Sequence, residues 1–279
     1  MKYKLSNEDY AIIRMALTED AGEEDITSSA IVSEGYSVDC EIIAKENSIL
    51  AGIDIAEACF LEQDHNLRIK RLKEDGEGLI SGDRVLLVSG KARAILSAER
   101  TALNFLQRLS GIATLTRRFV DAVAGKSKIY DTRKTTPTLR RMEKYSVQAG
   151  GGENHRFGLF DEILIKENHI AIAGGIEEAV RRVRKLHPKR FIEVETENLE
   201  EVKTAISCCV SRIMLDNFSQ EDMKKAITLI REAKNIEIEV SGNIELSNIR
   251  EIAELAPDII SCGKLTHSAP SVDFSLIIM

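Results

Sequence analysis

Residues 191–215 read FIEVETENLEEVKTAISCCVSRIML and contain a complete strand–helix–strand pattern. The run Phe191–Val194 has the length and apolar content of a buried strand, and Arg212–Leu215 repeats it. Between them, Leu199–Ile206 carries apolar residues at helical spacing. Two strands joined through a helix form a parallel pair, because parallel strands need a long crossover connection. This stretch therefore predicts a parallel α/β sheet.

The same rhythm continues on both sides of this stretch, from residue 128 onward. Further strand-like runs are Ile129-Tyr130, Ile163–Ile165, Ile236–Val240 and Asp258–Ile260, and further helical patterns are Ile176–Leu186, Gln220–Ala233 and Leu246–Leu255. Such repeats imply either a barrel or an open doubly wound sheet. About six clear repeats fall short of the eight of a full barrel, so we expect an incomplete (β/α) barrel over 109–266.

Residues 1–108 follow a different pattern. Short strands are expected near Val38–Ile42, Leu67–Leu72 and Arg84–Val88, and helices from Ser6 or Asn7 to about Glu19 and over Ile53–Glu62. This order indicates an α+β layer rather than barrel repeats. A long helical region over Ala92–Ala124 follows, with a break expected at Gly111.

Composition excludes several classes of function. The chain has 279 residues, 43% of them hydrophobic, and its formal charge of −7 argues against non-specific binding to nucleic acid or anionic membranes. Five cysteines form no C-x-x-C pair, which fits a reduced, cytoplasmic protein. The charged N-terminus resembles no signal peptide, and no apolar run approaches the roughly 20 residues that span a bilayer.

Charged or glycine-bearing turns follow each expected strand. They are Asp131–Lys134, Lys166, Glu195, Asp216, Ser241-Gly242-Asn243 and Cys262-Gly263-Lys264. In a barrel these strand ends converge on the face where barrel enzymes place their chemistry. We therefore expect an active site here, although a solvated set of loops is the alternative reading.

The residue types suggest a multiply charged anionic substrate. Arg133, Lys134, His155, Arg156 and Lys166 gather cationic groups around three consecutive glycines, whose bare backbone suits a sharp turn or a ligand. Glu195 and Asp216 offer the oxygen ligands that Mg²⁺ prefers. The turns at 241–243 and Gly263 suit a phosphate. Together these features predict a phosphorylated sugar substrate with a metal-bound leaving group.

Long motifs resemble the quinolinate phosphoribosyltransferase family. They are Glu99–Asn104, Ser110–Thr114, Asp131–Pro137, Gly150–Leu159, Leu164–His169, Glu193–Glu195, Met214–Asn217, Glu239–Gly242 and Leu265–Ser268. The likeness covers nearly the whole chain. Thr138 departs from it, because the family usually has glycine after that proline, and this puts only the local loop shape in doubt.

The resemblance implies that quinolinate and phosphoribosyl pyrophosphate give nicotinate mononucleotide, pyrophosphate and CO₂, a step of de novo NAD biosynthesis. It implies an N-terminal α+β sandwich domain, to which residues 267–279 return, and a homodimer, possibly part of a higher homo-oligomer, with shared active sites and Mg²⁺. Implied catalytic residues are Lys134, Lys166, Glu195 and Asp216, the last two also metal ligands. Implied substrate-binding residues are these four with Arg100 from the other subunit, Thr132, Arg133, His155, Arg156, Ser241, Gly242, Asn243, Cys262, Gly263 and Lys264.

Other readings of the sequence stay open at this point. A molybdenum-transport-associated paralogue shares the fold, although Lys166 and the intact Asn154-His155-Arg156 favour the quinolinate enzyme. A barrel isomerase or lyase acting on phosphorylated sugars would share the phosphate turns but gives no reason for so many cations. A nucleic-acid binder built on the basic stretch is disfavoured, since the chain is acidic and lacks aromatic residues between the basic ones.

Overall fold

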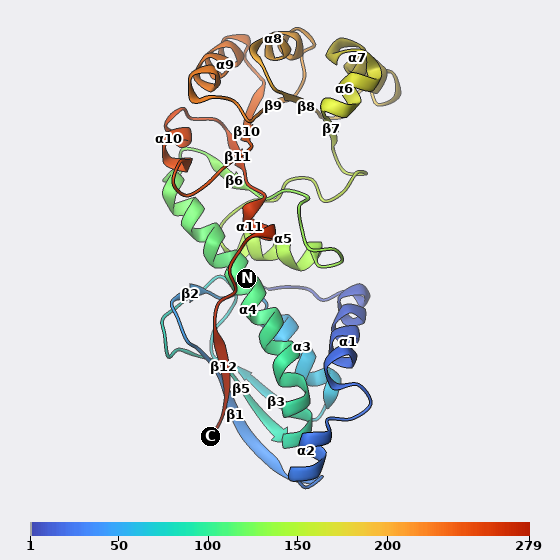
Figure 1. The fold of residues 1–279 in the computed structure, drawn as a ribbon, viewed down its shortest axis with the longest axis vertical. Coiled ribbons are helices and arrows are strands. Elements are labelled where there is room, and N and C mark those ends of the chain that lie inside the picture. The colour runs from blue at the N-terminus through green and yellow to red at the C-terminus, as the bar shows by residue number, and fades with distance from the viewer. Residues whose placement is uncertain (1) are drawn as a thin grey trace. The chain divides into compact units, whose positions relative to one another are not determined.

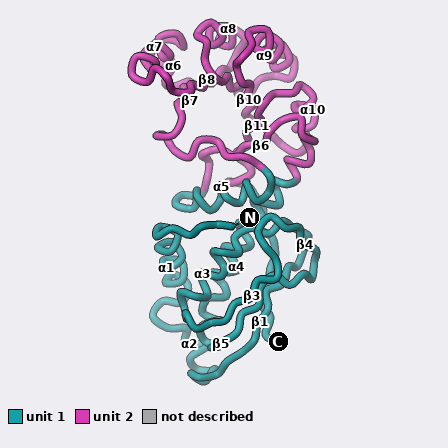
Figure 2. The backbone as a smooth tube through the Cα atoms, turned by 180° about the vertical axis from the view of Figure 1, so that it is seen from behind, with its two compact units in different colours: residues 1–117, 136–151, 268–279 teal, residues 118–135, 152–267 magenta. Residues whose placement is uncertain are grey.

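Residues 2–279, which the computed structural model describes, contain two large sheets of different kinds, one in each of two units (Figure 2). Unit 1 comprises Met1–Arg117, Thr136–Gly151 and Ser268–Met279, and unit 2 comprises Arg118–Thr135 and Gly152–His267. Each unit is thus assembled from separate segments of the chain. The domain division at residue 108 remains a prediction, because packing units and domain boundaries follow different criteria.

Unit 1 is built on an antiparallel sheet with the strand order β12-β1-β5-β3 and a small β2-β4 pair. Its elements are α1 (Asn7–Ala21), α2 (Ile26–Ile31), β1 (Ser37–Ala44), β2 (Ser48–Ile49), α3 (Ile53–Gln63), β3 (Arg68–Arg71), β4 (Gly78–Leu79), β5 (Arg84–Lys91), most of the long α4 (Ala92–Val123), α5 (Arg140–Ala149) and β12 (Phe274–Ile278). The part of α4 that follows Arg117 belongs to unit 2. The C-terminal β12 pairs with β1, from Cys40↔Ile278 to Ala44↔Phe274.

Local sequence explains how these elements begin and which face they bury. The Ser6 side chain caps α1 by accepting the N–H of Asp9, as expected, so one orphan donor of the first turn is satisfied. In β1, Cys40 and Ile42 are fully buried, in keeping with the alternation seen in the sequence. Both belong to one hydrophobic core, which also includes Leu103, Leu106 and Leu109 of α4.

Two glycines of unit 1 allow close backbone contact, and the expectation for one of them was wrong. Gly111 does not break a helix, because α4 runs uninterrupted through it. A Cβ at Gly111 would lie 2.1 Å from the carbonyl oxygen of Pro270, so glycine is needed for that close approach. Likewise a Cβ at Gly150 would lie 2.4 Å from the carbonyl oxygen of Ala113, and Gly151 turns at φ +91°. Packing against α4 thus accounts for Gly150, and the left-handed turn accounts for Gly151.

Unit 2 is built on a parallel sheet of six strands in the order β6-β11-β10-β9-β8-β7. Its elements are β6 (Lys128–Tyr130), β7 (Ile163–Ile165), α6 (Glu167–Ala173), α7 (Ile176–Leu186), β8 (Ile192–Thr196), α8 (Leu199–Ser207), β9 (Arg212–Asp216), α9 (Gln220–Ala233), β10 (Glu237–Ser241), α10 (Ile249–Glu254), β11 (Ile259–Ser261) and α11 (Lys264–His267). The predicted α/β class with an incomplete barrel and a separate N-terminal α+β unit is confirmed.

The strands of unit 2 divide their side chains between two buried faces. Helices α7, α8 and α9 lie outside strands β8, β9 and β10 (Figure 1). Successive residues of a strand point to opposite faces, so apolar residues such as Val194, Ile213 and Val240 alternate with inward ones. The inward positions carry unusual residues for a barrel interior, namely Glu193, Glu195, Arg212, Met214, Glu239 and Ser241. This interior is therefore partly ionic.

A short segment pairs with the free edge of β6. The backbone N–H of Glu153 donates to the carbonyl of Ile129 at 2.8 Å, and the N–H of Asp131 donates to the carbonyl of Glu153 at 3.2 Å. Tyr130 and Glu153 form an isolated parallel bridge. Residues that follow Glu153, including His155, are thereby held beside the strand ends.

No helix among residues 2–279 combines the length and the apolar character needed to cross a membrane.

Candidate active site

A cavity of about 320 Å³ lies at the carboxyl ends of the unit 2 strands. It is lined by Thr132, Arg133, Lys134, His155, Arg156, Leu164, Lys166, Glu167, Glu195, Met214, Asp216, Glu239, Ser241 and Ser261. Strand ends from all six strands or the turns after them contribute, as expected for parallel α/β folds. Nine predicted site residues, far apart in the sequence, thus meet in one place.

The other predicted site residues do not line this cavity. Arg100 is an exposed residue of α4 in unit 1. The Cys262 thiol is buried, and its S–H donates to the carbonyl of Ile244 at 3.5 Å, which indicates a structural role. Lys264 is paired with Glu245. Gly242, Asn243 and Gly263 lie in the turns that follow β10 and β11.

The cationic side of the cavity is built around Arg156, which is only 7% exposed. Its Nη1 donates to the carbonyl of Glu162 at 3.0 Å, whereas its buried Nε has no hydrogen-bond partner among the described residues. Burial and the neighbouring positive charge of Arg133 lower the pKa of Arg156. The carboxylates of Glu193, Glu162 and Asp161 only partly oppose this shift, so the desolvated guanidinium suits a further anion on this side of the cavity.

Lys166 and Glu195 form an ion pair across the cavity. The Lys166 side chain is 43% exposed and contacts the buried carboxylate of Glu195. Burial raises the pKa of Glu195, and the nearby Lys166 opposes that rise. Lys166 stands at the start of α6, directly after β7, so two neighbouring strands bring the pair together. A ligand that engages either group must compete with this contact.

The carboxylates of Glu195 and Asp216 fit the donor set of a hard cation. They come from the neighbouring strands β8 and β9, both line the cavity, and the charge of Asp216 contributes to the raised pKa of Glu195. Two close carboxylates beside a polar cavity are typical of Mg²⁺ bound with waters and substrate oxygens. These two residues would hold the ion.

Asn217 connects Asp216 to the turn after β10. Its Nδ2 donates to Asp216 Oδ2 at 2.7 Å, and its Oδ1 accepts from Asn243 Nδ2 at 3.0 Å. Gly242 has φ +87°, and a Cβ there would lie 2.2 Å from Asn217 Oδ1. The turn expected to bind phosphate is thus tied to the carboxylate expected to bind metal. The sequence reading included Asn217 in a motif but gave it no role.

The second glycine turn supports Lys134. A Cβ at Gly263 would lie 3.0 Å from Cδ of Lys134, so glycine leaves room for that side chain. Thr266 Oγ1 donates to the carbonyl of Lys134 at 2.8 Å, and the Lys134 N–H donates to Thr132 Oγ1 at 3.0 Å. The turn after β11 therefore fixes the backbone of the lysine that follows β6.

His155 has a hydrogen bond at one ring nitrogen and two carboxylates within ion-pair distance of the other. Its Nδ1 accepts the backbone N–H of Arg156 at 2.9 Å, while Nε2 lies 3.4 Å from Glu193 Oε2 and 3.3 Å from Glu239 Oε2. Burial disfavours a charged ring, but the two carboxylates outweigh it and raise the pKa of His155 to about 10. The hydrogen bond at Nδ1 favours a neutral ring instead, since a nitrogen that accepts an N–H carries no proton. Both observations place a proton on Nε2. The ring can take a second proton, at Nδ1, only if Nδ1 finds an acceptor in place of the backbone N–H of Arg156.

His155, Glu162 and Glu193 are a second set of possible metal ligands, with ligand atoms within 4.8 Å of one another. Glu193 already contacts Arg212 and His155. A divalent cation would have to displace both contacts, so Glu195 and Asp216 suit a metal better.

The ionic interior of the barrel does not follow from the apolar runs that predict strands β8 to β10. Glu193, Arg212 and Glu239 interrupt those runs. A signal was present, because these charges stand at alternate strand positions that share a face with Glu195, Met214 and Ser241. Period-two alternation of charge in a strand expected to be buried indicates a polar interior.

Comparisons with known proteins agree with the geometry. Residues 25–110 match the family model for the quinolinate phosphoribosyl transferase N-terminal domain, and residues 112–277 match that for the C-terminal domain. A probable nicotinate-nucleotide pyrophosphorylase (carboxylating) of Methanocaldococcus jannaschii is 44% identical to this chain. The match covers 97% of this chain and 98% of the length of that protein. The chloroplastic nicotinate-nucleotide pyrophosphorylase (carboxylating) of Arabidopsis thaliana is 41% identical, over 95% of this chain and 81% of its own.

Solved structures give the same result. The nicotinate-nucleotide pyrophosphorylase of Francisella tularensis superimposes with a TM-score of 0.94 at 41% identity, covering 99% of this chain and 98% of that one. Both units therefore follow the fold of these enzymes. The chain belongs to the quinolinate phosphoribosyl transferase family.

Proposed function

We propose that the unit 2 cavity transfers the phosphoribosyl group of phosphoribosyl pyrophosphate to quinolinate, with loss of pyrophosphate and CO₂, giving nicotinate mononucleotide for NAD biosynthesis. The observation that carries this proposal is the buried guanidinium of Arg156 beside Arg133, opposite two carboxylates in the same cavity. One side suits an aromatic dicarboxylate. The other suits a sugar bearing phosphates and a cation.

On the cationic side, Arg133, His155, Arg156 and Lys166 would hold the two quinolinate carboxylates. Arginine can grip a carboxylate through two parallel hydrogen bonds. A substrate carboxylate would also give Nδ1 of His155 an acceptor, which lets the ring take the second proton that Glu193 and Glu239 favour. Bound in this way, the pyridine nitrogen can be held close to the sugar, which replaces an encounter in solution by an oriented attack.

On the other side, Glu195 and Asp216 face the ribose, and the turn at Ser241–Asn243 faces the 5′-phosphate. Loss of pyrophosphate leaves positive charge on the ribose ring, which nearby carboxylates stabilise. Mg²⁺ bound there would supply charge stabilisation for the pyrophosphate. Lys134 and Lys166 would contact the same leaving group. The ring nitrogen forms its bond to the anomeric carbon as the bond to pyrophosphate breaks, without an enzyme nucleophile. When CO₂ leaves, the electron pair of the broken C–C bond stays on the ring carbon beside the positively charged nitrogen, and a proton from water replaces the carboxyl group there.

The activity is tested by product analysis. Quinolinate, phosphoribosyl pyrophosphate and Mg²⁺ are mixed with the protein, and nicotinate mononucleotide, pyrophosphate and CO₂ are measured together. Equal amounts of all three are expected. Nicotinate in place of quinolinate is the matched control, and it should react poorly because it lacks the second carboxylate. If the folded protein forms no nicotinate mononucleotide, the proposed activity is wrong and the molybdenum-transport-associated paralogue becomes the favoured alternative.

Exchange of arginine for lysine tests the carboxylate contacts. Arg133→Lys and Arg156→Lys keep the charge but lose the planar pair of donors. Each is expected to cost about 1.5–3 kcal/mol of transition-state stabilisation, through one charged hydrogen bond. The measurement is kcat/KM for quinolinate, with circular dichroism to show that the fold is retained. Near wild-type kinetics in both variants would remove these residues from the site.

Removal of metal tests the carboxylate side. Activity is expected to disappear with EDTA and to return with added Mg²⁺, and Asp216→Asn should need more Mg²⁺ for half-maximal activity. A titration of activity against free Mg²⁺ in both proteins measures this. Asp222→Asn, on α9 and outside the lining of the cavity, is the control and should titrate like the wild type. Full activity of the wild type without divalent metal would contradict the role of Glu195 and Asp216.

We further propose that the protein works in the cytoplasm as a homodimer, possibly within a larger assembly, whose subunits complete each other's sites. The support is Arg100, an exposed cation of unit 1 that the resemblance assigns to a quinolinate carboxylate, whereas all residues lining the cavity belong to unit 2. A two-fold dimer makes any such exchange occur twice.

A further inference from the structure

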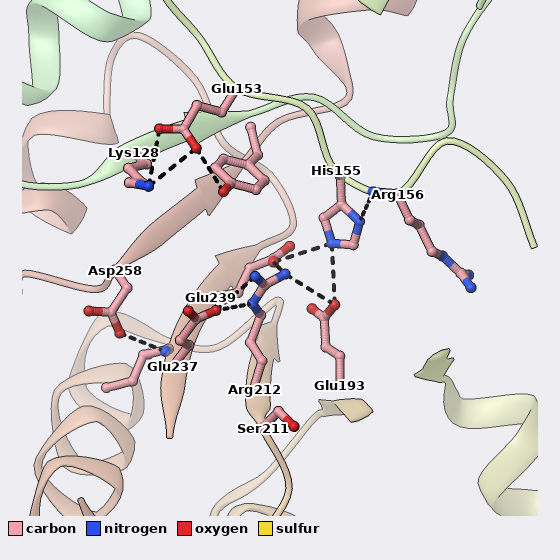
Figure 3. Close-up of polar contacts among 12 residues, drawn as sticks. Lys128, Glu153, His155, Arg156, Glu193, Ser211, Arg212, Glu237, Glu239 and Asp258 are labelled. Carbon is pink, nitrogen blue, oxygen red and sulfur yellow. Dashed lines mark hydrogen bonds and ion pairs between the residues drawn. The ribbon is translucent and has the colours of Figure 1, made fainter. Parts of the chain in front are cut away.

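A buried ionic cluster adjoins the cavity, and one of its members, Glu239, also lines it. The cluster consists of Glu193 on β8, Arg212 on β9 and Glu239 on β10, with Glu237 at its outer end (Figure 3). The side chains of Glu193 and Glu239 are 1% and 0% exposed. Buried carboxylates are retained only where positive partners offset the cost of their desolvation. The question is what these two carboxylates support.

Arg212 alone does not satisfy both carboxylates. Its Nε and Nη2 donate to Glu237 Oε2 at 3.0 and 2.8 Å, and its Nη1 lies 3.5 Å from both Glu193 Oε2 and Glu239 Oε2. The best bonds of the guanidinium thus go to the half-exposed Glu237. The second donor near the two buried carboxylates is Nε2 of His155, at 3.4 and 3.3 Å.

The orientation of the His155 ring affects the main chain of Arg156. The ring atom Nδ1 of His155 accepts the backbone N–H of Arg156. The backbone N–H of His155 donates to the buried Asp131 carboxylate at 2.9 Å. The imidazole is therefore fixed on two sides, by carboxylates at Nε2 and by the next residue's main chain at Nδ1. Figure 3 shows the Arg156 side chain leaving this point in a direction away from Arg212. Rotation of the ring would release the backbone from which that side chain starts.

We propose that Glu193 and Glu239 are positioning residues for quinolinate binding, acting through the Nε2–H of His155 and the main chain of Arg156. The inference rests on the proposed function, because it takes Arg156 and His155 as ligands of the substrate carboxylates. A carboxylate that accepts one imidazole N–H fixes the orientation and the tautomer of the ring, and so decides what the other nitrogen does. Here the other nitrogen holds Arg156.

The competing explanation is that the two carboxylates only stabilise the barrel. Glu237 allows a test that distinguishes the two explanations. It lies on the same strand as Glu239 and binds the same Arg212. The contacts described for Glu237 do not include His155. Glu237→Gln is therefore the matched control. It weakens the cluster through Arg212 and leaves the Nε2 side of His155 unchanged.

The experiment compares Glu193→Gln, Glu239→Gln and Glu237→Gln with the wild type. KM for quinolinate is expected to rise about ten- to a hundredfold in the first two variants, because each removes one of the two charged partners of His155 Nε2. KM for phosphoribosyl pyrophosphate and kcat should change by less than about threefold, since the sugar side is untouched. Glu237→Gln should leave KM for quinolinate within about twofold of the wild type.

Nitrogen NMR of the ring gives a readout that stability alone does not move. With the five histidines labelled and the His155 signal assigned by its loss in His155→Gln, the wild type should show a protonated Nε2. The Glu193→Gln and Glu239→Gln proteins should show mixed tautomers, and Glu237→Gln should match the wild type. Thermal unfolding reports the stability of each variant separately.

Three results would overturn the proposal. One is an unchanged KM for quinolinate in a folded Glu193→Gln or Glu239→Gln protein. The second is an equal rise in Glu237→Gln. The third is an unchanged Nε2 signal in both test variants. If the wild type forms no nicotinate mononucleotide, the proposed function fails instead, and the NMR comparison still decides whether the carboxylates hold His155. If one variant does not fold, the other and the His155 signal give the answer.

Discussion

Replacing Arg212 with alanine is expected to destabilise the protein by about 3–5 kcal/mol, because it leaves buried carboxylates without their cation. The Arg212 side chain is 8% exposed and lies between Glu193, Glu237 and Glu239. Its guanidinium also lies 5.0 Å from the centre of the Phe191 ring and 6.0 Å from that of Tyr130, so packing is lost together with charge. Urea denaturation followed by circular dichroism measures the loss.

The pH dependence of this loss identifies its cause. Burial and the Glu239 carboxylate already raise the pKa of Glu193 to about 7. A carboxyl group whose pKa is raised in the folded state stays protonated there at low pH. The protein loses stability as the pH rises from the unfolded-state pKa of that group through its raised folded-state pKa. Without Arg212 the penalty for ionising Glu193 grows, so the difference between variant and wild type should be larger near pH 8 than near pH 5. A difference independent of pH would point to lost packing.

Arg231→Ala is the matched control for Arg212→Ala. Arg231 also binds a carboxylate through two nitrogens, both 3.0 Å from Asp258, but its side chain is 46% exposed. Exposed pairs of this kind contribute about 0–1 kcal/mol. An equally small effect of Arg212→Ala would mean that water reaches the interior of the barrel and screens its charges.

Mixing two inactive variants is expected to restore about a quarter of wild-type activity if the active sites are shared. Arg100→Ala removes a cation of unit 1, and Lys134→Ala removes one that lines the cavity of unit 2. Each homodimer should be nearly inactive. In a heterodimer one site carries both changes and the other carries neither. Random pairing makes roughly half of the molecules heterodimers, each with one intact site of two.

Co-expression with two different affinity tags, followed by sequential purification, isolates the heterodimer and raises the expected activity to about half of wild type. Native mass spectrometry confirms its composition. The control pairs Lys134→Ala with Lys166→Ala, because both residues line the same cavity, so a heterodimer of these variants has no intact site. Recovery in that control, or no recovery with Arg100→Ala in confirmed heterodimers, would contradict the proposed sharing of sites.

The sequence by itself determined the six strands of unit 2, its helices α7 to α10 and most of the residues that line its cavity. Strand runs such as Ile163–Ile165 and helical patterns such as Ile176–Leu186 coincide with β7 and α7, because apolar periodicity is local information. Lys166, Glu195 and Asp216 could be predicted as neighbours, since the carboxyl ends of parallel strands meet on one face.

Only the tertiary structure decided the environment of those residues. Gly111 looks like a helix break in the sequence, and its true constraint is the carbonyl oxygen of Pro270, which lies 159 positions away along the chain and 2.1 Å from a Cβ placed there. Glu193, Arg212 and Glu239 belong to three separate strands, and nothing local states that their side chains meet around His155. Charge pairing, burial and close backbone contact depend on distances between segments that no local pattern encodes, so folding alone sets them.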